Sequence, residues 1–296
     1  MRPLSRVPTI AAPRFSTAEP VRLSGDDPAA TVWPAGEHTP RVIMQRVGEW
    51  CWIEVDDVAS YRFPADSVDR GVRADAFPVA GVAESVVFDL YYRTVVPVAL
   101  QVYGFESMHG TALEHGGGAV LLCAPSRTGK STLAQALADA GWQPLADDGL
   151  VWEAREGSHE GIYLHPIPFS LMLRQPVPSA PDPAGSAPRA RPLPAAGEPG
   201  RRDAVPVRAV LLLERTAGGE PAAARLGRRE AFTRLLAPSY ALTLADKERK
   251  ARMMAAYLRL AGTVPVFAFQ YPSGYERLPE VVGFVERLLA RGVLRM

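Results

Sequence analysis

The residues best suited to chemistry form one run, APSRTGKST, from Ala124 to Thr132. This run matches the phosphate-loop (Walker A) pattern G-x-x-x-x-G-K-[ST] except at its first position, where alanine replaces glycine. In such loops backbone N–H groups hold phosphate oxygens, and the following helix presents its positive N-terminal end to them. Lys130 is expected to neutralise the β and γ phosphates of ATP, and the Ser131 hydroxyl to bind Mg²⁺. The predicted nucleotide-binding residues are Ala124, Pro125, Ser126, Arg127, Thr128, Gly129, Lys130, Ser131 and Thr132.

Two residues of the loop depart from common forms of the motif. Ala124 replaces the first glycine, which is tolerable where the backbone avoids positive φ. Arg127 stands where many such loops carry glycine, and its side chain either points outward or folds over the γ-phosphate. A degenerate, non-catalytic nucleotide site is therefore one alternative that the sequence leaves open.

A pair of carboxylates follows the loop. Asp147 and Asp148 lie 17 and 18 residues after Lys130, at the end of an apolar strand. In an open parallel sheet, ligands bind at the carboxyl ends of the strands. If the strand before the loop and the strand before the aspartates are parallel and joined by the helix, both carboxyl ends lie at the same edge. The aspartates would then lie beside the phosphates. One carboxylate can bind Mg²⁺ while the other accepts a proton from an attacking hydroxyl. The alternative is a turn in which Asp148-Gly149 merely reverses the chain.

His109 precedes a glycine turn, on the strand expected to pair with the one that enters the loop. A lone histidine on a strand is more often a packed residue than a catalyst, so both interpretations stay open here. The other histidines have no spacing to one another or to a cysteine that indicates a metal site.

The elements that must position these groups alternate between strands and helices, which predicts the α/β class. A helix with Pro97 near its end is expected over residues 82–100. Expected strands cover residues 108–113, 119–123, 144–153, 161–174 as a pair, 207–214 and 265–272. Expected helices cover residues 131–142, 229–238, 245–262 and 278–292.

The chain divides into three parts. We expect a disordered tail over 1–19, a small β-rich N-terminal domain over 20–80 and a phosphate-loop domain over 81–296. Of the 28 prolines, eight fall within residues 176–199. Proline cannot continue a helix or a central strand, so residues 176–206 are expected as an exposed loop.

Composition narrows the class of partner. Thirty-three basic against 32 acidic side chains give a net charge of +1, which argues against nucleic acid as the main partner. Residues 201–260 carry 13 Lys and Arg against 6 Asp and Glu, a local basic excess. No apolar run reaches the ~18 residues needed to cross a bilayer, so no membrane partner is expected. Two cysteines could form at most one disulfide bond, so the sequence favours a reducing, cytoplasmic location.

His109, the segment AVLLCAPSRTGKSTLAQAL and the segment LADDGLVW together resemble the catalytic domain of the HPr kinase/phosphorylase family and its related (HprK-like) P-loop kinases. The resemblance is clearest over residues 105–155 and extends more loosely to residue 231. It implies a P-loop kinase core of the type shared with phosphoenolpyruvate carboxykinase. It also implies transfer of the γ-phosphoryl group of ATP to a serine hydroxyl of a protein.

Carried residue by residue, the resemblance implies Lys130 on the phosphates and His109 near the transferring phosphate. Ser131 and one aspartate would bind Mg²⁺, and the other aspartate would act as base. We assign the base to Asp147 and the metal to Asp148, and the exchanged assignment stays open. The implied catalytic residues are thus Asp147, His109 and Lys130. Members of the family assemble as hexamers, which implies a homo-oligomer.

The departures from the family bear on the substrate. Thr132 stands where true HPr kinases usually carry glutamate, Arg127 stands where they carry glycine, and the N-terminal part differs. Related kinases with altered N-terminal parts resemble tailoring enzymes of peptide biosynthesis, including lasso peptide clusters. The expected acceptor is therefore a serine of a peptide or small protein. A small-metabolite P-loop kinase and a non-catalytic ATP-binding regulatory module are the alternatives.

Overall fold

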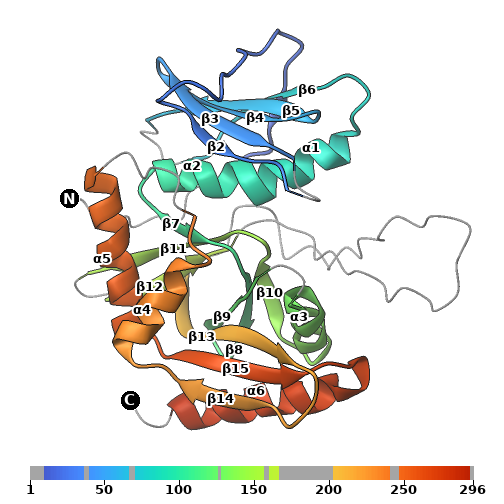
Figure 1. Ribbon diagram of the computed structural model, residues 1–296, viewed down its shortest axis with the longest axis vertical. Coiled ribbons are helices and arrows are strands. Elements are labelled where there is room, and N and C mark those ends of the chain that lie inside the picture. The colour runs from blue at the N-terminus through green and yellow to red at the C-terminus, as the bar shows by residue number, and fades with distance from the viewer. Residues whose placement is uncertain are drawn as a thin grey trace, which may run out of the picture.

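Two β-sheets joined by a helical segment make up the computed structural model, which describes residues 10–36, 40–66, 71–125, 128–156, 160–166, 203–240 and 247–293 (Figure 1). Within these residues the N-terminal sheet has six strands in the order β1-β6-β5-β4-β3-β2. Its neighbours are antiparallel except for the parallel pair β1 and β6. The strands are β1 Arg14–Phe15, β2 Thr31–Trp33, β3 Val42–Val47, β4 Trp50–Val55, β5 Ala59–Pro64 and β6 Asp75–Pro78.

The expected tail and N-terminal domain differ in part from this arrangement. Residues 1–9 lie outside the described residues, whereas Arg14–Phe15 forms β1 and Ile10 is buried. Residues 10–15 therefore belong to the sheet, because backbone N–H groups of Ala11 and Arg14 donate to carbonyls of residues 72 and 74. A two-residue edge strand has too little periodicity to be read from a sequence.

The helical segment consists of α1 Glu84–Leu90, a π-helical turn Tyr91–Val95 and α2 Val96–Val102. We expected Pro97 to kink or end this helix; it does not end it, and the regular α-helix is interrupted by the π-helical turn just before Pro97. Pro97 lies in the first turn of α2, and the preceding turn is widened so that the Val96 N–H donates to the Tyr91 carbonyl. In a regular α-helix a proline ring clashes with the carbonyl of the residue four positions before it. A wider π turn at this place relieves that clash. Buried side chains of the segment share one core with the N-terminal sheet, and Phe105 and Val151 belong to the same core, so the segment packs against both parts of the chain.

The second sheet has nine strands within the described residues and curls around β13, which belongs to both of its parts. The middle of β13 pairs in parallel with β9 and β15, and its first residues pair with β12. The strands are β7 Glu106–Met108, β8 Thr111–His115, β9 Gly118–Cys123, β10 Gln143–Ala146, β11 Leu150–Arg155, β12 Gly161–His165, β13 Val205–Thr216, β14 Ala222–Arg225 and β15 Val266–Pro272. The fold is thus a mixed α/β fold with a β-rich N-terminal sheet and a curled second sheet.

Helices cover both faces of this sheet. They are α3 Lys130–Asp139, α4 Arg228–Leu236, α5 Lys247–Thr263 and α6 Leu278–Val293. Leu133 and Leu137 of α3 share one core cluster with Val281 and Val285 of α6. Side chains of α4 and α5 belong to a second cluster. The central strands β9 and β13 are buried between these clusters, which explains their continuous apolar sequences.

Three local expectations need correction. Residues 144–153 form two strands, β10 and β11, separated by the turn at residues 147–149. The strands β7 and β14 were not expected, and both are short. Of the predicted proline-rich loop, residues 176–202 lie outside the described residues, and β13 begins at Val205, before the predicted end of the loop at residue 206.

Candidate active site

The phosphate loop joins β9 to α3, as the motif requires. The strand ends at Cys123 and the helix begins at Lys130, with Gly129 at φ 97° as its N-terminal cap. The backbone of Ala124 does not adopt a positive φ, so the alanine Cβ causes no backbone strain at this position. Ser126 and Arg127 lie outside the described residues.

Tyr271, at the end of β15, anchors the loop from the side. Its hydroxyl donates a hydrogen bond of 2.5 Å to the Thr128 carbonyl, and the Thr128 hydroxyl donates one of 2.7 Å to the Pro125 carbonyl. A Cβ at Gly129 would lie 2.8 Å from the Tyr271 hydroxyl oxygen. Gly129 is therefore required both for its backbone conformation and for the close approach of Tyr271. No signal in the sequence pointed to Tyr271.

The Lys130 side chain lies against its own loop. Its ammonium donates to the Ala124 carbonyl at 2.7 Å and contacts His109 Nε2 at 2.9 Å. The residue is 7% exposed, and burial lowers the pKa of the ammonium. Two of the three residues expected to be catalytic therefore touch each other.

His109 lies between β7 and β8 rather than on a strand. Its backbone N–H donates to the Pro238 carbonyl at 2.6 Å, and its Nδ1 lies 3.0 Å from the Asp148 carbonyl. Because an ammonium can only donate, Nε2 accepts from Lys130 and Nδ1 carries the ring proton. Burial and the Lys130 charge lower the pKa of His109, so its ring is neutral.

Asp147 follows β10 directly, although β10 is not beside β9 as a parallel sheet would place it. Both strands pair antiparallel with β8, so they run in the same direction and their carboxyl ends meet at one edge. The Asp147 carboxylate is buried and accepts a hydrogen bond of 2.5 Å from the Thr111 hydroxyl. Burial, and then the neighbouring Asp148, raise the pKa of Asp147 to about 6.

Asp148 occupies the centre of a tight turn with φ 60°, in which the Gly149 N–H donates to the Asp147 carbonyl at 2.7 Å. Its carbonyl accepts from His109 Nδ1 and, at 3.1 Å, from the Tyr240 hydroxyl. A non-glycine residue at positive φ persists only where the surroundings hold it. The expected chain-reversing turn is present, and the same turn presents both carboxylates.

Arg93 is a site residue that the sequence analysis missed. Its guanidinium forms an ion pair with the Asp148 carboxylate and a second one, at 2.6 Å, with Asp89. It comes from the π-helical turn, so the helical segment of the N-terminal unit reaches the site. The Arg93 side chain is 11% exposed and that of Asp148 is 40% exposed, so the carboxylate stays open to solvent on one side.

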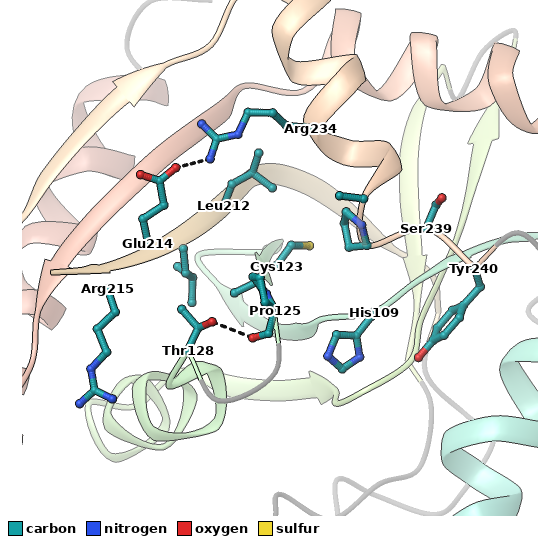
Figure 2. A pocket seen from close by; sticks show the side chains of 14 residues that line it. His109, Cys123, Pro125, Thr128, Leu212, Glu214, Arg215, Arg234, Ser239 and Tyr240 are labelled. Atoms are coloured by element: carbon teal, nitrogen blue, oxygen red, sulfur yellow. Dashed lines mark hydrogen bonds and ion pairs between the residues drawn. The ribbon is translucent and has the colours of Figure 1, made fainter. Parts of the chain in front are cut away.

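A cavity of about 880 Å³ adjoins the loop (Figure 2). Neither aspartate is among its lining residues. These are His109, Cys123, Ala124, Pro125, Thr128, Leu212, Leu213, Glu214, Arg215, Arg234, Ala237, Pro238, Ser239 and Tyr240. The cavity thus shares His109 and the loop with the site, and the two carboxylates lie outside its lining.

The donors near Asp148 fit Mg²⁺ in kind. Mg²⁺ usually takes one or two carboxylates, keeps several waters and binds substrate phosphates, so a full protein cage is not needed. In the described residues no three His, Cys, Asp or Glu side chains gather as a metal cage. Asp148 already carries a cationic partner, Arg93, and Ser131 lies on the first turn of α3, partly buried. A solvent-accessible carboxylate beside a phosphate loop suits such an ion.

Part of the basic excess of residues 201–260 is compensated by acids from other segments. Arg249 is buried and pairs with Glu106 at 2.8 Å, and Arg259 lies 3.0 Å from Glu156. Within the range, Arg234 pairs with Glu214. None of the helices in the described ranges combines the length and apolar character needed to cross a membrane.

Comparison with known proteins gives partial structural likenesses among solved structures. No protein-family model matches the chain, and no curated protein sequence matches it. Among solved structures, the HPr(Ser) kinase/phosphatase from Coxiella burnetii is similar to it with 13% identity and a TM-score of 0.30, over 62% of this chain and 98% of that chain. In part of its structure the chain is thus similar to an HPr(Ser) kinase/phosphatase.

Proposed function

We propose that this protein is an ATP- and Mg²⁺-dependent kinase that transfers the γ-phosphoryl group to a serine hydroxyl of a peptide or small protein. The observation that carries the proposal is a chain of contacts from Lys130 through His109 to Asp148. It links the phosphate-loop lysine to the acidic turn, over residues that lie far apart in the sequence.

Lys130 is the residue that would neutralise the nucleotide phosphates. Its contacts are with two carbonyl oxygens and a neutral imidazole, and none is an ion pair with a carboxylate. Among the described residues no carboxylate is in direct contact with this charge, although Asp148 and Asp147 act on it from farther away, and it suits an incoming anion. The free N–H groups at the start of α3 add a further attraction for phosphate.

The two aspartates suit different tasks. Asp147 has a raised pKa, which favours accepting a proton from the acceptor hydroxyl near neutral pH. Asp148 is more exposed, so we assign it to the metal together with Ser131, and Mg²⁺ would compete with Arg93 for its carboxylate. When bound there, Mg²⁺ would neutralise charge on the phosphate oxygens.

His109 is assigned a place beside the transferring phosphate. Because its ring is neutral and its Nδ1 proton is bonded to the Asp148 carbonyl, it can hold the Lys130 ammonium without adding a charge. It would thereby keep the lysine directed toward the phosphates, which is a contribution by positioning.

The test is phosphoryl transfer in a lysate with labelled ATP and Mg²⁺, followed by mass spectrometry of the labelled species. Lys130→Ala should lower transfer by at least about 10²-fold, a usual cost of removing one charge-stabilising group. Lys250→Ala is the matched control, because Lys250 is exposed on α5 and should leave transfer unchanged. A labelled serine peptide supports the proposal. Wild-type transfer by Lys130→Ala, or labelling of metabolites alone, contradicts it.

A further inference from the structure

The cavity beside the phosphate loop has two ends of different chemistry (Figure 2). One end holds His109 and Tyr240, and the other holds Glu214, Arg215 and Arg234. Between these ends lie loop residues and apolar side chains that include Leu212. A ligand seated on the loop could therefore extend from the reacting groups toward the charged end.

The direction of such a ligand follows from where the carboxylates lie. Asp147 and Asp148 are outside the cavity lining, so an acceptor hydroxyl that meets Asp147 approaches from another side. A nucleotide with its terminal phosphate toward the aspartates would direct its remaining part away from them. The cavity is the space that opens in that direction.

Glu214 is a fixed carboxylate at the charged end of the cavity. It lies near the end of β13, is partly exposed, and accepts hydrogen bonds from Arg234 and, at 3.1 Å, from the Gln270 amide. These bonds lower the pKa of Glu214, so the group is ionised at neutral pH. A carboxylate has about four lone-pair sites, and two are used. The remaining sites can accept hydrogen bonds from a ligand.

We propose that this cavity binds the nucleoside part of a ribonucleoside triphosphate and that Glu214 accepts hydrogen bonds from the ribose hydroxyls. The inference rests on the proposed kinase function and adds the recognition of the sugar. Vicinal hydroxyls are two donors on one ring, and an acidic side chain is a common partner for them at nucleotide sites. Arg234 and Gln270 hold the carboxylate in place, so they act as positioning residues.

The experiment measures binding of ATP and of 2′,3′-dideoxy-ATP, with Mg²⁺, by calorimetry. The wild-type protein should bind ATP about tenfold more tightly, as expected for one hydrogen bond to a charged group. Glu214→Ala should weaken ATP binding by about tenfold and leave the dideoxy nucleotide unchanged, so the preference disappears. The ratio of the two affinities does not depend on the fraction of folded protein.

Glu230→Ala is the matched control. Glu230 also lies near Arg234, at 4.0 Å, but it does not line the cavity, so its removal should preserve the preference for ATP. An unchanged preference in Glu214→Ala would overturn the inference. So would a weaker affinity for the acceptor peptide with an unchanged affinity for ATP. If Lys130→Ala transfers phosphate as the wild type does, the proposed kinase function fails, whatever Glu214 does.

Discussion

The Lys130 ammonium lies 2.9 Å from Nε2 of His109, whose other ring nitrogen is bonded to the Asp148 carbonyl. This relationship fixes the tautomer of the ring, because Lys130 can only donate. We predict that ¹⁵N NMR of the metal-free protein at pH 7 will find His109 neutral, with its proton on Nδ1. Burial and the Lys130 charge lower its pKa, so protonation is expected only below the ordinary value of about 6.5.

Lys130→Met is the control for this prediction. Removing the ammonium removes one of the two causes that lower the pKa of His109, whereas burial and the Asp148 contacts stay. The pKa should therefore rise relative to the wild type. An Nε2-protonated ring in the wild-type protein would contradict the hydrogen-bond assignment.

The buried carboxylate of Asp147 leads to a second prediction, which concerns how the stability of the protein depends on pH. Its folded-state pKa of about 6 lies above the ordinary value of about 3.9 for an unfolded chain. The folded state thus binds this proton more tightly, so stability falls as pH rises from about 4 to about 6. The substitution Asp147→Asn removes the titrating carboxyl group, and with it this loss of stability at higher pH. At pH 8 in EDTA the free energy of unfolding of this variant should exceed that of the wild type by roughly 3 kcal/mol, at about 1.4 kcal/mol per pKa unit.

At pH 4 the difference between Asp147→Asn and the wild type should shrink toward zero, because the wild-type group is then protonated in the folded state. Urea denaturation at both pH values measures it. Asp139→Asn serves as the control, since Asp139 is an exposed carboxylate on α3. A stability gain that is equal at both pH values would show that the charge of Asp147 is not its cause.

Gly129 offers a test of how the loop is held. Gly129 and Gly141 flank α3 with φ 97° and 94°, but a Cβ would meet the Tyr271 hydroxyl only at Gly129. Both Gly129→Ala and Gly141→Ala should cost about 1–2 kcal/mol for the positive φ. Gly129→Ala should cost more, and should also weaken ATP binding, because the loop must move away from Tyr271.

The excess cost at Gly129 should fall when Tyr271→Phe is introduced as well, since the clashing oxygen is then absent. Urea denaturation and ATP calorimetry of the single and double variants measure these effects. If Gly129→Ala and Gly141→Ala cost the same with Tyr271 in place, the close approach has no energetic consequence.

The sequence predicted those parts of the site that are local in the chain. A phosphate loop is a contiguous pattern between a strand and a helix, so the positions of Gly129 and Lys130 followed from it. The aspartates followed from their place at the end of the next strand, whereas a role for His109 required a family resemblance as well. Arg93 and Tyr271 were missed because they reach the site through tertiary packing, from residues 55 positions before Asp148 and 143 positions after Thr128.

The order of the strands was also beyond local patterns. β8 lies between β9 and β10 in the sheet. The sequence of an apolar strand does not indicate which strand it pairs with, so this order could not be predicted. The aspartates still reach the loop because two antiparallel pairings restore the strand direction. The π turn before Pro97 was likewise unreadable, since its residues suit an ordinary helix.

Arg93 leads to the last prediction, which concerns the metal. Its guanidinium forms an ion pair with the Asp148 carboxylate, so Mg²⁺ and Arg93 would compete for the same negative charge. Arg93→Met should lower the free energy of unfolding by about 1–3 kcal/mol without metal, because Asp148 and Asp89 lose a charged hydrogen-bond donor. Added Mg²⁺ should then raise the melting temperature of the variant more than that of the wild type. Arg155→Met, which breaks an ion pair with Glu153 outside the site, should show the wild-type response to Mg²⁺. Equal Mg²⁺ shifts in Arg93→Met and the wild type would remove Asp148 from the metal assignment.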